Sequence, residues 1–135
     1  YIGAGTVLTL EDAIEAYKYK AQFIVTPNVN ESVIRFCLEK ELLCFPGAAT
    51  TTEIANAISY GAKYIKVFPS GALGPQYLRE IRGPFDADNA NSFIQSGAIG
   101  IGVGSSLCNK ELILNRDDKA LIDCASRLIK NCNIV

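Results

Sequence analysis

The sequence predicts an α/β fold in which buried parallel strands alternate with helices, as in a βα barrel or a doubly wound sheet. Short stretches that are apolar on both faces recur along the chain, which is typical of strands in a parallel sheet. Segments with the apolar spacing of amphipathic helices lie between them. The first four stretches begin about 20 residues apart, the length of one strand plus one crossover helix. The predicted strands are Ile2–Leu8, Gln22–Thr26, Leu42–Phe45, Tyr64–Phe68 and Ala98–Val103.

Helix-start signals follow each of the first three strands. Thr9 with Asp12 marks the first start, Asn30 marks the second, and Thr50 with Glu53 has the spacing of a capping box. Reciprocal capping explains Glu53 better than a role as a catalytic acid or base does. The apolar faces of the three helices are Leu10, Ala13, Ile14 and Tyr17; Val33, Ile34, Cys37 and Leu38; and Ile54, Ala57 and Ile58.

The alternation fails in the second half of the chain. Helices predicted over Pro75–Arg82 and Asp88–Ser96 follow one another with a short connection that supplies no strand. We therefore expect one strand to be missing between Phe85 and Asp86. The tail from Asn109 to Val135 predicts a closing helix. We interpret residues 1–135 as one incomplete domain that also lacks upstream residues.

Composition excludes several classes of function. The 135 residues carry a net charge of −1 and 20% charged side chains, so a nucleic-acid partner is not expected. No apolar run is long enough for a membrane span, and we expect a cytoplasmic protein. The sequence contains no histidine, which excludes the usual zinc sites and a Ser-His-Asp relay from this stretch. The five cysteines form no C-x-x-C pair and are interpreted as buried, reduced thiols.

Lys66 is the most informative residue for chemistry. Alternation along its strand places Tyr64, Lys66 and Phe68 on one face, so the amine projects from an apolar ladder. Apolar surroundings disfavour an ammonium ion and leave free amine that can attack a carbonyl and form a Schiff base. The alternatives from spacing alone are an edge-strand lysine that reaches water and a lysine paired with an acid.

Two further segments are candidates for binding. The run from Gly102 to Ser106 follows a predicted strand, where small residues let backbone N–H groups approach a phosphate, although close packing explains it equally well. Thr6 could direct its hydroxyl into a barrel mouth or stand there for its strand propensity. The glycines around Thr6 do not match G-x-G-x-x-G, because Leu8 occupies the third position.

Taken in order, the motifs of this chain resemble the KDPG/KHG aldolase family. Seven matches in register, from Ile2 to about Leu107, make the resemblance specific. The matching runs are Gly3–Leu8, Phe23–Pro27, Phe45–Gly47 with Thr52–Ile54, Lys66–Pro69, Leu73–Pro75, Gly83–Phe85 and Gly102–Ser105.

The resemblance implies a (β/α)8 TIM-type barrel and a class I aldolase. Such an enzyme cleaves 2-keto-3-deoxy-6-phosphogluconate to pyruvate and glyceraldehyde 3-phosphate, or 4-hydroxy-2-oxoglutarate to pyruvate and glyoxylate. Lys66 falls on the family's Schiff-base lysine, Thr6 on a residue lining the pyruvate site, and Pro27 and Phe68 on its walls. Gly104 and Ser105 fall where the family contacts the far end of the substrate. No metal or other cofactor is expected, because the cationic imine stabilises the developing carbanion. The resemblance also suggests a homotrimer.

Two parts of the family pattern are not found in this sequence. The family's first two strands carry a proton-shuttling glutamate and a carboxylate-binding arginine, and a later strand ends in a Pro-Thr-Gly-Gly motif. The latter belongs between Phe85 and Asp86, where the alternation of elements also fails. Alternatives to the aldolase are a phosphate-binding barrel isomerase or lyase in which Lys66 acts electrostatically, and a degenerate barrel that only binds a sugar phosphate.

Overall fold

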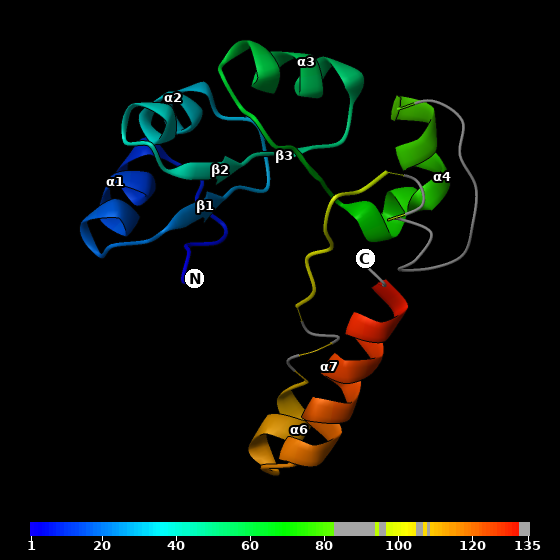
Figure 1. Ribbon diagram of the computed structural model, residues 1–135. Helices are drawn as coiled ribbons and strands as arrows, with labels where there is room; N and C mark the ends of the chain where they lie inside the picture. Colours follow the sequence, from blue (N-terminus) through cyan, green and yellow to red (C-terminus); the bar gives the residue numbers. More distant parts are fainter. Residues whose placement is uncertain (83–93, 95–96, 105–106, 108, 133–135) are drawn as a thin grey trace. The chain divides into compact units, whose positions relative to one another are not determined.

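The computed structural model describes residues 1–82, 94, 97–104, 107 and 109–132 (Figure 1). The chain divides into two compact units, Tyr1–Leu73 and Gly74–Val135. Among the described residues, no helix has both the length and the apolar character needed to cross a membrane. The single barrel domain expected over residues 1–135 stays a prediction.

Parallel strands form the centre of the first unit. Phe23 is in register with Leu43, and Gly47 is in register with Lys66. The segments that pair are β1 (Phe23–Val25) with β2 (Leu43–Phe45), and β3 (Gly47–Ala48) with β4 (Lys66–Val67).

Backbone hydrogen bonds connect these two pairs into one row of neighbouring segments. Pro46 alone separates β2 from β3, and its carbonyl accepts a hydrogen bond from the Lys66 N–H at 2.9 Å. On the other side of β1, Ala4 forms a parallel bridge with Ile24, which is the part of the predicted strand Ile2–Leu8 that pairs as a strand. The row therefore follows the order of the sequence, as strand–helix–strand units in a parallel sheet do.

Three helices cover the strands, and each begins where the sequence predicts. Thr9 and Asp12 close a capping box at the first, Asn30 accepts hydrogen bonds from the N–H groups that open the second, and Thr50 closes a capping box at the third. These side chains satisfy N–H groups that have no partner inside a helix. The helices are α1 (Leu10–Lys18), α2 (Glu31–Glu39) and α3 (Thr51–Ser59).

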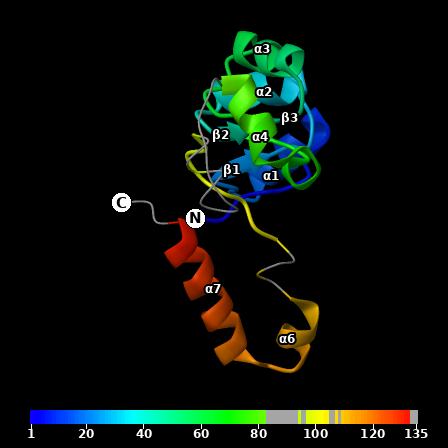
Figure 2. The same ribbon diagram turned by 90° about the vertical axis from the view of Figure 1, so that its right-hand side faces the viewer.

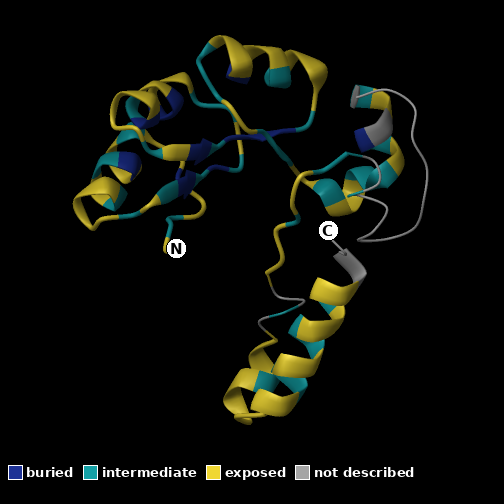
Figure 3. Ribbon diagram, viewed as in Figure 1, coloured by how far each residue is buried: buried dark blue, intermediate teal, exposed yellow. Residues whose placement is uncertain are grey.

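The core lies between the helices and the helix-facing side of the strands. Ile24, Val33 and Cys37 are fully buried there, and Cys44 is 9% exposed. Figure 3 shows buried segments, in dark blue, on the helices and strands of this unit. Ala13 and Ala57, which the helical spacing assigns to the inner faces of α1 and α3, are also fully buried. This confirms the α/β alternation over the first unit.

The regular secondary structure described in the second unit is helical. In α4 (Ser70–Arg82) the backbone breaks at Gly74, whose φ of 74° lies outside the helical region, and Pro75 then opens the second part of the helix. Near the end of the chain, α6 (Lys110–Leu114) and α7 (Asp118–Cys132) pack against each other as a helical hairpin (Figure 2). The closing helix is therefore present, and its residue Ile129 is exposed.

One predicted strand is wrong. Residues 98–103 are not a strand, and Ile99 is 78% exposed. A strand exists through its ladder of backbone hydrogen bonds, and no described residue supplies such a ladder to this stretch. Most of the predicted helix Asp88–Ser96, together with the expected gap between Phe85 and Asp86, lies outside the described residues.

Candidate functional site

Lys66 is the first residue of β4, and its backbone is hydrogen-bonded to the segment that contains Pro46 and β3. It pairs with Gly47, and its side-chain Nζ lies 4.2 Å from the ring centroid of Phe68, two residues along. An ammonium group at this distance from an aromatic face is attracted by the ring quadrupole. Lys66 is half-buried and Phe68 is 40% exposed, so the described residues cover the amine incompletely.

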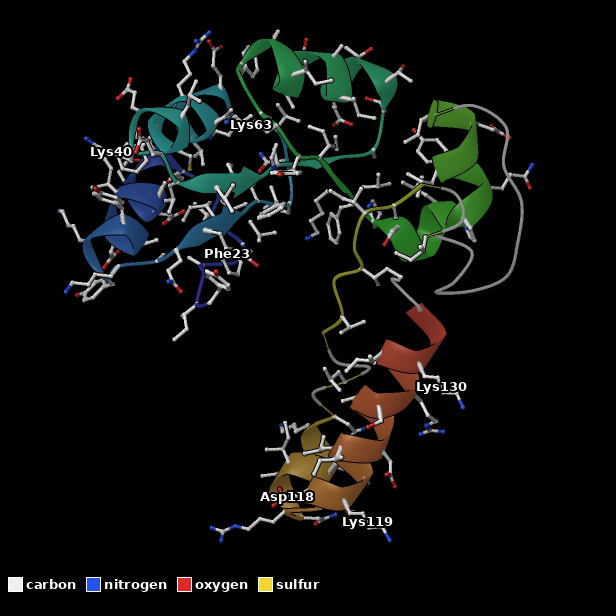
Figure 4. The ribbon with its side chains drawn as sticks, in the orientation of Figure 1. Phe23, Lys40, Lys63, Asp118, Lys119 and Lys130 are labelled. Atoms are coloured by element: carbon white, nitrogen blue, oxygen red, sulfur yellow. The ribbon has the colours of Figure 1, made fainter. Side chains whose placement is uncertain are left out.

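An aromatic series shows which face of the strands Lys66 occupies. The rings of Phe45 and Tyr64 stack at 5.6 Å, and Phe23 meets Phe45 edge-on at 6.1 Å. The alternating residues Ile24 and Cys44 are buried against the helices, so the aromatic rings lie on the opposite face (Figure 4 labels Phe23). Lys66 is two residues after Tyr64 and shares that face. In a closed barrel this face would be the interior.

Thr6 has an unusual backbone at the end of the first strand segment. Its φ is 57°, in the left-handed region that β-branched residues rarely adopt. The next residue, Val7, is again hydrogen-bonded to β1, because its N–H donates to the Val25 carbonyl at 3.3 Å. Thr6 is exposed. Backbone strain of this kind costs about 1–3 kcal/mol and is often kept where a side chain has a functional orientation.

Pro27 and Gly47 approach each other at the ends of neighbouring strands. A Cβ on Gly47 would lie 2.5 Å from the carbonyl carbon and oxygen of Pro27, so the glycine is required for this contact. Thr26 reinforces the contact, because its hydroxyl donates to the Asn28 carbonyl and accepts from the Gly47 N–H at 3.4 Å. The Thr26 side chain is 1% exposed, and these bonds satisfy its buried hydroxyl.

Four sequence-predicted site residues therefore lie on one edge of the parallel row. Thr6 follows the bridge at Ala4, Pro27 follows β1 and Phe68 follows β4, each within two residues. Lys66 lies in β4, one residue before its end. The carboxyl edge is where open and closed α/β sheets bind their ligands.

Comparison with known proteins identifies the family. A family model described as KDPG and KHG aldolase matches residues 1–124. The chain belongs to this aldolase family. Membership of this family also shows that the fold is of the α/β class.

Relatives in the aldolase family include sugar-acid aldolases from bacteria. A 2-dehydro-3-deoxy-6-phosphogalactonate aldolase of Escherichia coli K12 is 37% identical over 118 residues, which cover 78% of this chain and 58% of the relative. A 2-dehydro-3-deoxy-phosphogluconate aldolase of Treponema pallidum is 44% identical over 73 residues, covering 54% of this chain and 35% of the relative. The match with this chain thus spans 58% of the Escherichia coli relative and 35% of the Treponema pallidum relative.

Solved structures of family members have the same fold. A structure described as native KDPGal superposes with a TM-score of 0.78 and 32% identity, covering 96% of this chain and 70% of that one. A KDPG aldolase from Legionella pneumophila, described with pyruvate captured as a covalent carbinolamine, superposes with a TM-score of 0.77. At 22% identity, with 94% of this chain and 68% of that chain covered, the Legionella structure is evidence for the fold alone.

The remaining two predicted site residues lie outside the first unit. Gly104 belongs to the second unit, where its carbonyl accepts a hydrogen bond from the Leu107 N–H at 2.9 Å. It is exposed and a Cβ there would meet nothing within 4 Å. Ser105 lies outside the described residues.

Glu53 has the structural role that its spacing predicts. Its Oε2 accepts hydrogen bonds from the Ala49 N–H at 2.9 Å and the Thr50 N–H at 2.8 Å, and it also contacts the Thr50 hydroxyl. Hydrogen bonds from Ala49 and then from Thr50 favour the carboxylate and hold the pKa of Glu53 below its usual range. The Glu53 carboxylate therefore caps the start of α3 and stabilises the helix there.

Sequence reasoning missed the close backbone contact between Gly47 and the Thr26–Pro27 segment at the carboxyl edge. Gly47 follows Pro46 at the end of a strand and was recognised only as part of a motif, yet it allows the Thr26–Pro27 backbone to approach. The pairing of a buried threonine with that glycine depends on two strands being neighbours. The sequence did offer one signal, a glycine just after the predicted strand Leu42–Phe45. A glycine in or next to a strand often marks a place where another backbone approaches closely.

Proposed function

We propose that this chain carries the Schiff-base site of a class I aldolase, with Lys66 as the catalytic nucleophile. The observation that carries the proposal is the position of Lys66 on the strand face away from the helices, at the carboxyl edge that also holds Thr6 and Pro27. Membership of the aldolase family supports the same role.

The proposed chemistry begins with attack of the Lys66 amine on the C2 carbonyl of a 2-keto acid. The carbinolamine loses water to give a protonated imine, and this cation accepts the electron pair when the carbon–carbon bond breaks. Cleavage releases the aldehyde and leaves an enamine on Lys66. Protonation of the enamine carbon and hydrolysis of the imine then release pyruvate and restore the amine.

The proposed substrates are 2-keto-3-deoxy-6-phosphogluconate and 4-hydroxy-2-oxoglutarate. The named relatives act on phosphorylated 2-dehydro-3-deoxy sugar acids, which supports a keto-acid substrate here. We assign Thr6, Pro27 and Phe68 to the pyruvate end. Gly104 and Ser105 are assigned to the far end of the substrate.

We further propose that the strand row of the first unit forms four neighbouring members of a (β/α)8 barrel. Its parallel order, with one helix between successive segments, supports this architecture. An incomplete barrel domain over residues 1–135, with a strand missing between Phe85 and Asp86, is part of the proposal. Assembly as a homotrimer and a cytoplasmic location are also proposed, on the resemblance and the composition respectively.

Borohydride trapping tests the assignment of Lys66. The protein is incubated with pyruvate, reduced with borohydride and measured by intact mass, and we expect a gain of one reduced pyruvyl group that maps to the Lys66 peptide. Lys66→Ala should abolish the gain. Lys63→Ala is the matched control, since Lys63 is an exposed lysine just before the same strand, and it should retain the adduct.

The same experiment separates the aldolase from its alternatives. An isomerase, a lyase with an electrostatic lysine or a binding protein would give no borohydride-dependent adduct. An adduct that survives Lys66→Ala would place the nucleophile elsewhere. The trapping is performed on this chain.

A further inference from the structure

Thr26 is a buried polar residue just after β1, and the proposed chemistry gives it no role. Its side chain is 1% exposed, and alternation with the buried Ile24 places it on the helix-facing side of the strand. A hydroxyl in such a place costs free energy unless it is hydrogen-bonded. The two hydrogen bonds of this hydroxyl therefore explain why a threonine stands here.

The Thr26 hydroxyl replaces one rung of the ladder between neighbouring parallel strands. The Thr26 N–H donates to the Phe45 carbonyl at 3.2 Å, so a regular parallel ladder would continue from the Gly47 N–H to the Thr26 carbonyl. The Gly47 N–H instead donates to the Thr26 side-chain Oγ1 at 3.4 Å. Gly47 is buried, and the hydroxyl gives its N–H an acceptor away from water.

The same hydroxyl also fixes the loop that follows β1. It donates to the Asn28 carbonyl, and Pro27 lies between the two residues that this bond joins. The Pro27 backbone already lies against Gly47, since a Cβ on Gly47 would be 2.5 Å from the Pro27 carbonyl. The distance between Pro27 and Gly47 is therefore set both by steric contact and by the Thr26 hydroxyl.

The segment 45–48 carries this constraint to β4. Lys66 is in register with Gly47, and the Lys66 N–H donates to the Pro46 carbonyl at 2.9 Å. The segment is thus hydrogen-bonded to Thr26 on one side and to Lys66 on the other. A displacement of the segment away from Thr26 would move the backbone that bears the proposed nucleophile.

We propose that Thr26 is a positioning residue for the aldolase reaction, because its hydroxyl sets the spacing between Pro27 and Lys66. The inference rests on the proposed function, in which Pro27 borders the pyruvate end and the Lys66 amine attacks the C2 carbonyl. This attack needs a near-attack arrangement, and a displacement of about 1 Å can slow such a reaction about 100-fold. Thr26 acts through these two residues and transfers no proton.

Trapping rates test the role of the hydroxyl. The folded chain is incubated with saturating pyruvate and cyanoborohydride, and the Lys66 adduct is followed over time by intact mass. Thr26→Val keeps the shape of the side chain without its hydroxyl and should form the adduct about 10-fold more slowly than the wild type. Thr26→Ser keeps the hydroxyl and should react at a rate close to that of the wild type.

Ile34→Val is the matched control for a loss of stability alone. It removes one methylene from a residue of α2 that is 2% exposed, so it should lower the free energy of unfolding and leave the trapping rate unchanged. Should Thr26→Val fail to fold, Thr26→Cys takes its place, because a thiol is a much weaker hydrogen-bond acceptor than a hydroxyl.

Amide hydrogen exchange measures the positioning without any reaction. Thr26→Val should speed the exchange of the Gly47 and Lys66 N–H groups by a larger factor than Ile34→Val does, because only the first variant removes an acceptor at this edge. Equal factors in the two variants would overturn the inference.

Three results of the trapping would also overturn it. They are a wild-type rate in Thr26→Val, an equal slowing in Thr26→Ser, and an equal slowing in Ile34→Val. If the wild-type chain forms no adduct at all, the proposed function fails, and the exchange measurement alone decides whether Thr26 holds Gly47 and Lys66 in place.

Discussion

The two faces of the strand row differ in how completely the described residues of the first unit cover them. On the helix side, Ile24 is fully buried under α1 and α2. On the other side, Val25 and Lys66 are only half-buried, and Tyr64 and Phe68 are exposed. The described residues therefore enclose the helix side as a core, whereas they cover the face that bears the proposed nucleophile only in part. Stability and catalysis should respond separately to substitutions on the two faces.

Replacing Ile24 and its neighbour Val25 with alanine is the strongest test of this difference. Ile24→Ala removes a fully buried side chain and should lower the free energy of unfolding by about 2–5 kcal/mol. Val25→Ala, on the opposite face of the same strand, should cost less than about 1.5 kcal/mol because its side chain already meets solvent. Urea unfolding followed by circular dichroism measures both. Equal losses would show that the second face is also covered.

Gly47→Ala should have the next largest effect. The new Cβ would overlap the Pro27 backbone, which cannot move as a flexible side chain can, and we expect a loss of about 1–3 kcal/mol. Thermal unfolding of Gly47→Ala measures it. Gly102→Ala is the matched control, because a Cβ there meets nothing within 4 Å. A normal melting temperature for Gly47→Ala would contradict the close approach.

Local signals predicted the first unit well because each depends on residues close in sequence. The capping residues Thr9, Asn30 and Thr50 stand at the helix starts, since a cap is formed by a side chain and N–H groups two or three residues away. Alternation likewise placed Lys66 on the face of Tyr64. These features need no knowledge of which strands are neighbours.

Features that depend on neighbouring strands were not predictable in this way. The positive φ of Thr6 and the Thr26–Gly47 contact arise where separate segments meet at the carboxyl edge. The strand expected over residues 98–103 fails for the same reason, because an apolar run becomes a strand only where another strand offers it hydrogen bonds. Its composition matched that of the true strands.

Thr9→Ala should have a smaller effect than either core substitution. It removes the acceptor for the Asp12 N–H and should cost about 1 kcal/mol. Thr9→Ser keeps the hydroxyl and is the matched control, with unfolding near that of the wild type. Urea midpoints measure both variants. A loss in Thr9→Ser equal to that in Thr9→Ala would assign the effect to packing rather than to the cap.

Acid titration of the capping carboxylates should give the smallest effect. Hydrogen bonds from Leu8 and then Thr9 hold the pKa of Asp12 below its usual range, as those from Ala49 and Thr50 do for Glu53. A depressed pKa means that the unfolded chain binds protons first as the pH falls, so this stabilisation is present above about pH 5 and is lost below about pH 4. Glu53→Gln keeps an acceptor oxygen for the capping box but cannot titrate. Urea unfolding at pH 7 and pH 3 should therefore show a smaller pH-dependent loss in Glu53→Gln than in the wild type, and identical losses would mean that the Glu53 carboxylate gains nothing from its ionised form in the folded state.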